Sequence, residues 1–159
     1  MEAFNLAAGI ASLLGLVFSA LAFRQAKNAS AAAQEARNAV RIRSLASELE
    51  TLCVRAEQLV DFLLHERLPE ASLRVGELGS LLSEIPSRAR AHLVTDQVNT
   101  LLTIREQVSI IGDVIQRGPA ELQNLQPDNK VIITSRLVAT MLREVLGAVK
   151  SKVESEGEK

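Results

Sequence analysis

The sequence predicts an all-α protein: an N-terminal transmembrane helix that continues into an Ala-rich helical stalk and then into an antiparallel four-helix bundle. Aromatic residues make up only 3% of the 159 residues, and Trp and Tyr are absent, which leaves little for a β-sheet. Ala, Leu, Glu and Arg are abundant instead, and all four favour helices. We expect a transmembrane anchor at 1–23, a stalk at 24–41, a cytoplasmic helical bundle at 42–153 and a disordered tail at 154–159.

The expected anchor rests on an uncharged run at 3–23, AFNLAAGIASLLGLVFSALAF. At about 1.5 Å per residue, a helix of this length covers the ~30 Å hydrocarbon core of a bilayer. A cleaved signal peptide is the alternative, because Ala20-Leu21-Ala22 has the small-x-small form of a cleavage site. A basic n-region is missing, however, and the apolar run exceeds the roughly 7–15 residues of the apolar h-region in a signal peptide. We therefore expect an uncleaved anchor.

The orientation of the anchor follows from its flanking charges. No Lys or Arg precedes the run, and five follow it closely: Arg24, Lys27, Arg37, Arg41 and Arg43. The positive-inside rule then predicts a single-pass protein with its N-terminus outside and its C-terminal domain in the cytoplasm. A lone cysteine, Cys53, fits the reducing cytoplasm because it cannot form an intrachain disulfide.

Small residues repeat along the anchor and the stalk at the spacing of a helix–helix contact. The expected oligomerisation seam consists of Ala7, Ala11, Gly15, Ser19, Ala22, Ala26, Ala29 and Ala33. Small side chains at this spacing let helix backbones approach closely in lipid, and spacings of three and four continue the seam as a heptad pattern. A single solvated helix is the alternative for the stalk, because Ala has the highest helix propensity and needs no partner. We expect a homo-oligomer.

Four helical segments are expected beyond the stalk. The first continues from the anchor and ends before Pro69, because a residue that precedes proline is disfavoured in the α conformation. The second is expected to be closed by Pro86. The third covers about 87–117 and stops at a Gly-Pro pair, and the last covers about 128–153 after an Asp-Asn capping signal.

Each segment carries an apolar face that is expected to build the core. In the first segment the seam changes register near 40–42 and continues with Ile42, Leu45, Leu49, Leu52, Ala56, Leu59 and Leu63. The other expected core residues are Leu73, Leu78, Leu81, Leu82 and Ile85; Leu93, Val94, Val98, Leu101, Val108, Ile111 and Ile115; and Ile133, Leu137, Met141, Val145 and Val149. The longest expected loop covers 120–129.

The sequence offers no motif for catalysis or for cofactor binding. His65, His92 and Cys53 are far apart, and HExxH, CxxC, GxSxG and phosphate-binding glycine loops are all missing. Cys53 stands beside Leu52 in the apolar seam, so we expect a small core residue there. The protein is therefore expected to be no enzyme and to bind neither a metal nor a cofactor.

Two groups of charged residues can each be interpreted in more than one way. A net charge of −1 argues against a general nucleic-acid binder. Arg88 and His92 could form a phosphate-contacting or ribonuclease-like corner, or a solvated corner between helices. Six other charged residues border the apolar faces of the last two segments, where they could form ion pairs or line a pocket or an axial channel: Arg105, Glu106, Asp113, Arg136, Arg143 and Glu144.

The layout of one anchor, an Ala/Arg-rich helix (FRQAKNASAAAQEARNAVRIR) and a short helical bundle resembles small membrane-anchored effectors of bacterial phage defence. An example of such effectors is the oligomeric membrane-pore accessory protein of type VI-B CRISPR systems, whose soluble part resembles a HEPN helical domain. HEPN nucleases space their Arg and His further apart than Arg88 and His92, so no catalytic residue carries over. The resemblance implies a non-enzymatic effector in a bacterial inner membrane.

The sequence therefore supports two competing functions. In the first, copies assemble in the lipid bilayer through the small-residue seam and act as a pore or membrane-perturbing effector. In the second, the anchor only fixes the location, and the helical bundle is an adaptor that binds a cytosolic protein partner. A hydrolase or nuclease would need a convergent polar site, which the sequence does not offer.

Overall fold

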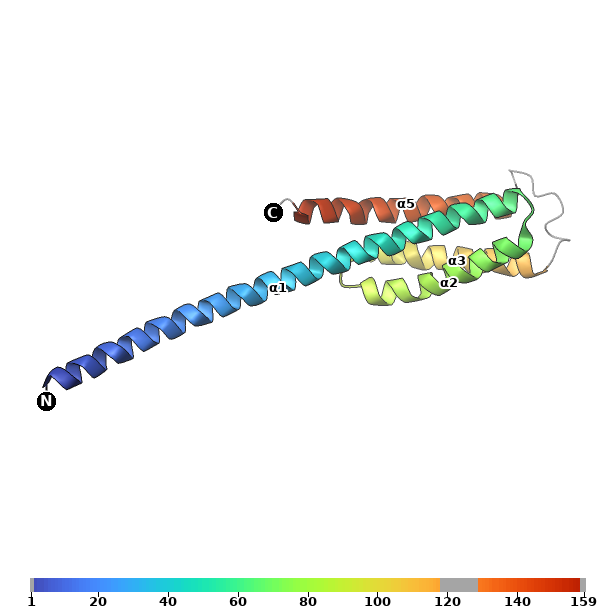
Figure 1. Ribbon diagram of the computed structural model, residues 1–159. Helices are drawn as coiled ribbons and strands as arrows, with labels where there is room; N and C mark the ends of the chain where they lie inside the picture. Colours follow the sequence, from blue (N-terminus) through green and yellow to red (C-terminus); the bar gives the residue numbers. More distant parts are fainter. Residues whose placement is uncertain (1, 118–128, 158–159) are drawn as a thin grey trace. The chain divides into compact units, whose positions relative to one another are not determined.

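The computed structural model describes residues 2–117 and 129–157, with side chains described at 18–19, 21–117 and 129–155. The described residues form four α-helices and no β-strand: α1 (Glu2–Leu64), α2 (Leu68–Ala89), α3 (Thr95–Arg117) and α5 (Lys130–Gly157), shown in Figure 1. The all-α class is thereby confirmed. The chain divides into two compact units, Met1–Val40 and Arg41–Lys159.

The first unit is the N-terminal part of α1. Between 21 and 40 every side chain except the half-buried Ala39 is exposed. Nowhere in the described part of the chain is a helix both long enough and apolar enough to cross a membrane. The expected anchor falls mostly on residues 1–17 and 20, whose side chains lie outside the described part.

The second unit is a four-helix bundle made of residues 41–64 of α1 together with α2, α3 and α5, which lie side by side in Figure 1. α3 packs against both α2 and α5. α1 meets α2 through Glu48–Arg88 and meets α5 through Glu57–Arg143. Along both interfaces a later residue on α1 pairs with an earlier one on its neighbour, so α1 is antiparallel to both.

The core confirms the expected face of the first segment. All seven expected seam residues of α1 between Ile42 and Leu63 are buried, five of them fully. They are joined by apolar side chains of the other helices, among them Leu78, Leu101, Ile104 and Leu142. Because cores of this kind are close-packed, the seam residues fix how α1 sits within the bundle.

The α2–α3 turn differs from the expectation. Pro86 lies inside α2 and is buried, and the helix continues to Ala89. Proline removes one helical N–H, but burial of its ring in the core offsets the lost bond. The turn then closes because the amides of His92 and Leu93 both donate to the carbonyl of Ala89, at 2.8 and 3.0 Å. α3 consequently starts at Thr95 rather than at 87.

The first half of α5 presents a different face to the core from the one expected. Ile132 is fully buried, whereas the expected core residues Ile133 and Leu137 are each 52% exposed. Ser135 takes a core position, and its hydroxyl donates to the carbonyl of Val131 at 2.8 Å. This local bond satisfies a buried polar group, which hydropathy alone would place outside.

Smaller differences concern single positions and helix ends. Leu73 and Val94 are exposed although we expected them in the core, and Ile104 is buried although we did not. α5 extends to Gly157, beyond the expected end at residue 153. The expected loop at 120–129 lies outside the described residues except for Asn129, whose side-chain oxygen accepts from the amide of Val131 at 2.9 Å.

Candidate functional site

The candidate site is the surface of α1 in the first unit. The described members of the expected oligomerisation seam are all exposed: Ser19, Ala22, Ala26, Ala29 and Ala33. Ala7, Ala11 and Gly15 belong to the residues whose side chains are not described. The exposed alanines therefore offer a surface that none of the described side chains of the first unit covers.

Large apolar side chains are exposed on the same helix just before its first cation. Phe18 is 68% exposed, Leu21 52% and Phe23 73%. Phe18 and Phe23 are five residues apart, so they point about 140° apart around the helix axis. This stretch is therefore apolar on more than one face, which is typical of a helix surrounded by lipid or by other helices.

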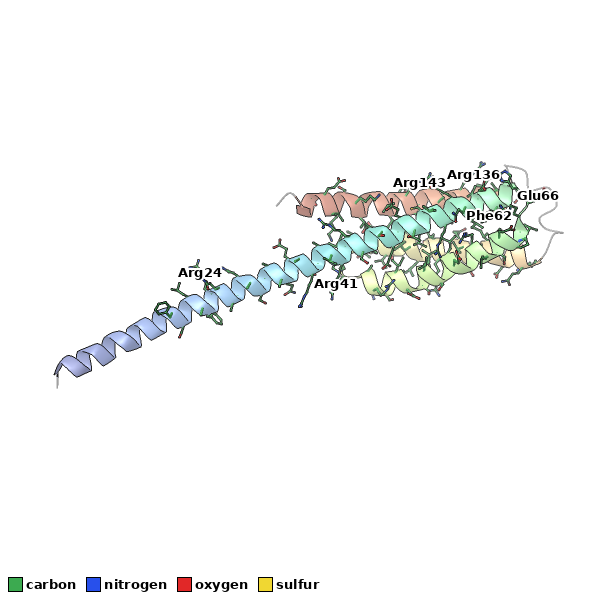
Figure 2. The ribbon with its side chains drawn as sticks, in the orientation of Figure 1. Arg24, Arg41, Phe62, Glu66, Arg136 and Arg143 are labelled. Atoms are coloured by element: carbon green, nitrogen blue, oxygen red, sulfur yellow. The ribbon has the colours of Figure 1, made fainter. Side chains whose placement is uncertain are left out.

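The five expected membrane-orientation residues are all exposed. Arg24, Lys27 and Arg37 belong to the first unit, whereas Arg41 and Arg43 belong to the bundle. Among the described residues none of the five has an ion-pair partner. Figure 2 shows Arg24 and Arg41 extending from α1 at separate points along the helix. Their guanidinium groups are thus open to solvent or to an anionic partner.

The expected Arg88–His92 corner is an open cleft of about 260 Å³ at one end of the bundle. Its polar lining comes from Arg41, Ser44, Glu48, Arg88 and His92. The Arg88 guanidinium lies 2.9 Å from the Glu48 carboxylate and 3.8 Å from that of Glu84. Because its charge is already matched by two carboxylates, Arg88 serves to join α1 to α2, which is the solvated-corner interpretation.

The charged residues that border the last two helices do not converge on one site. Arg143, which is labelled on α5 in Figure 2, forms an ion pair with Glu57 of α1, with 2.5 Å between Nη2 and the carboxylate oxygen Oε1. Arg105 and Asp113 line a shallow open cleft between α2 and α3 of about 310 Å³. Glu106, Arg136 and Glu144 are exposed. This arrangement supports the interpretation that Arg143 stabilises the bundle through an ion pair.

Cys53 is buried within the bundle, as expected for a core residue. Burial raises the pKa of its thiol, and the nearby carboxylate of Glu57 raises it further. A thiol with a raised pKa is a poor nucleophile at neutral pH, because the thiolate is the reactive form. In the described ranges, no three His, Cys, Asp or Glu side chains lie close enough together to hold a metal ion.

Two features of the bundle surface escaped the sequence analysis. One is the exposed pair Ile133 and Leu137, four residues apart on α5. The other is a charged cluster in which Glu77 of α2 pairs with both Arg55 of α1 and Arg74. A heptad count along α1 could have indicated its α1 member, because Arg55 follows Arg41 and Glu48 at intervals of seven residues beside the core face.

No protein-family model, curated protein or solved structure matches this chain. The exposed stretch of α1 that contains Phe18, Leu21 and Phe23 is the surface that most clearly requires an apolar environment.

Proposed function

We propose that this chain is an oligomeric single-pass membrane protein that acts as a non-enzymatic membrane effector, either as a pore or as a membrane-perturbing component. The observation that carries the proposal is the exposure of Phe18, Leu21 and Phe23 immediately before Arg24. With the uncharged residues that precede them, these side chains complete a segment long enough to span a bilayer.

Contact with lipid explains why the large apolar side chains are exposed, and self-association explains why the small ones are. Each of the three large apolar side chains costs roughly 1.5–3 kcal/mol in free energy when it stays in water rather than in an apolar environment. A bilayer removes that cost. The seam of Ser19, Ala22 and Ala26 then offers a narrow strip along which backbones of neighbouring copies can approach closely.

A polar column supports the pore form of the proposal. In the sequence Asn5, Ser12 and Ser19 recur every seven residues, a spacing that places them along one face of a helix. A single span can line a pore only when several copies assemble with such a face inward. The inner-membrane location and an anti-phage role rest on the resemblance to phage-defence effectors.

The native mass of the full-length protein in detergent tests the proposal. We expect a discrete oligomer that Ala29→Leu converts to smaller species, because a larger side chain pushes the close-packed backbones apart. Ala31→Leu is the matched control, since residue 31 lies on the opposite face of the helix from the seam. A wild-type monomer, or equal effects of both variants, would contradict it.

One observation favours the adaptor as a second candidate. Ile133 and Leu137 form an exposed apolar pair on α5 that could contact a cytosolic protein. Exchange of residues 1–23 for an unrelated transmembrane segment separates the two functions. An adaptor keeps its cellular activity after this exchange and loses it with Ile133→Ser and Leu137→Ser, whereas an effector loses membrane depolarisation on the exchange alone.

A further inference from the structure

We propose that Arg24 and Lys27 form a binding site for the headgroups of anionic phospholipids at the point where α1 leaves the bilayer. The inference rests on the proposed membrane function and adds the partner that this part of the surface recognises. It starts from the position of the two cations relative to the exposed apolar side chains that end at Phe23.

Arg24 and Lys27 lie on the same face of α1. They are three residues apart, which places them about 4.5 Å apart along the helix axis and on neighbouring turns of one face. Both side chains are exposed. Asn28 follows Arg24 by four residues, so its amide is near the same face and adds a hydrogen-bond donor. The site thus offers two charges and a neutral donor.

The charge of this pair is not offset along the helix. From residue 18 to residue 34 the sequence contains no Asp or Glu, and the nearest carboxylate is that of Glu35. Glu35 lies eight residues beyond Lys27, or about 12 Å along the axis, which exceeds the ~8 Å Debye length at physiological ionic strength. No carboxylate of this stretch therefore offsets the attraction of both cations for an anion at the bilayer surface.

Phosphodiester headgroups match this site in chemistry and in position. A guanidinium binds two phosphate oxygens at once, and an ammonium acts as a compact point charge. Since Phe23 directly precedes Arg24, insertion of the apolar stretch brings Arg24 to the depth of the headgroups. A net-neutral phosphatidylcholine surface gives the pair less attraction than phosphatidylglycerol, because its choline groups balance its phosphates.

The third cation of the first unit, Arg37, is not equivalent to this pair. Arg37 lies ten residues beyond Lys27, about 15 Å along the axis, and Glu35 is only two residues away from it. Arg37 is exposed, like Arg24 and Lys27, so it is a matched control for charge and exposure. The inference thus separates Arg24 and Lys27, which contact headgroups, from Arg37, which does not.

Native mass spectrometry of the full-length protein in mixed micelles tests the site. The probe is phosphatidylglycerol, with phosphatidylcholine of the same acyl chains as the reference, and the spectrum reports both bound lipid and the number of copies. We expect preferential retention of phosphatidylglycerol. Arg24→Gln or Lys27→Gln should weaken it about fivefold each and the double variant about 25-fold, whereas Arg37→Gln should leave it unchanged.

The outcomes separate the headgroup site from the membrane function. Equal retention of the two lipids, or an equal loss in Arg37→Gln and in the double variant, overturns the headgroup site alone. Competition by millimolar inorganic phosphate as effective as that by phosphatidylglycerol overturns it too, because the site would then bind free phosphate. Failure of the wild type to float with phosphatidylcholine vesicles overturns both the headgroup site and the proposed membrane function.

Discussion

Arg143 of α5 and Glu57 of α1 meet across the bundle, where Nη2 and Nε of the guanidinium lie 2.5 and 3.0 Å from the same carboxylate oxygen, Oε1. The next pair along this interface, Lys150 with Glu50, lies seven residues further on α5 and seven residues earlier on α1. The two pairs share one heptad register between antiparallel helices. A slip of α5 by one helical turn would separate both pairs.

Removal of this contact should cost little stability, because both side chains are about half exposed. We expect Glu57→Gln to lower the free energy of unfolding by less than about 1 kcal/mol. The double variant Glu57→Arg with Arg143→Glu should restore most of the loss. Thermal unfolding of the full-length protein in detergent measures both effects, with Arg136→Gln as the exposed control on the same helix. A loss in the charge-swapped protein larger than that in Glu57→Gln would contradict the assignment.

Added volume at Gly112 of α3, which faces Val75 of α2, should be poorly tolerated. A Cβ at Gly112 would lie 2.9 Å from Cγ1 of Val75, whereas a Cβ at Gly147 of α5 would meet nothing within 4 Å. Gly112→Ala should therefore destabilise the protein by roughly 1–3 kcal/mol. Gly147→Ala should stabilise it by roughly 0.5–1 kcal/mol through helix propensity. Chemical denaturation compares the two variants.

The second substitution at this interface identifies the cause. Val75→Ala removes the atom that a Cβ at Gly112 would meet, so it should recover part of the cost of Gly112→Ala in the double variant. Strict additivity of the two single effects would mean that the contact with Val75 is not responsible.

Adjacent isoleucines on α5 provide a direct test of which face enters the core. Ile132 is fully buried and Ile133 is 52% exposed. Ile132→Ala should cost about 2–5 kcal/mol, the range for a fully buried aliphatic side chain, and Ile133→Ala less than about 1 kcal/mol. Urea denaturation of both variants measures the difference. A larger cost for Ile133→Ala than for Ile132→Ala would support the face that the sequence predicts, and equal costs would contradict the observed one.

This pair also illustrates how far the sequence predicts the fold. The seam of α1 from Ile42 to Leu63 repeats without interruption, so its phase could be predicted and is confirmed. On α5 two isoleucines are adjacent and a serine occupies a core position, so hydropathy cannot choose between two phases. Tertiary packing and the bond from Ser135 to the carbonyl of Val131 decide instead.

At the helix ends and in the candidate site, too, local patterns could be predicted and tertiary contacts could not. Pro86 alone indicates a helix end, but burial of its ring keeps it inside α2. For the candidate site, the sequence predicts the position of the apolar residues before Arg24 because they form one continuous run. It could not predict the pairing of Arg88 with Glu48, because that contact joins residues 40 positions apart.

Because of Cys53, the free energy of unfolding should decrease at alkaline pH. Burial raises the pKa of its thiol in the folded state above the ordinary value of 9.0. As the pH rises past 9, the unfolded chain releases the thiol proton first and the folded chain keeps it, so the free energy of unfolding decreases; below pH 9 the thiol has no such effect. Urea denaturation at pH 7 and pH 10 should show a larger decrease in wild type than in Cys53→Ala. Equal decreases would mean that other groups cause the fall.

The end of α1 carries a strained residue whose replacement should stabilise the protein. Glu66 has φ of 56°, a conformation that favours glycine, and is labelled beside Phe62 in Figure 2. The amide of Arg67 donates to the carbonyl of Phe62 at 2.8 Å and that of Glu66 to Leu63 at 3.2 Å, which together form a Schellman motif.

The motif closes with a contact between side chains, because the Arg67 guanidinium lies 4.9 Å from the centre of the Phe62 ring. Glu66→Gly should therefore raise the free energy of unfolding by about 1 kcal/mol, through relief of the left-handed strain. Glu66→Val should lower it, because a β-branched side chain is least tolerated at positive φ. Thermal unfolding of the full-length protein provides the comparison. A loss of stability in Glu66→Gly would show that the glutamate side chain contributes more than its backbone strain costs.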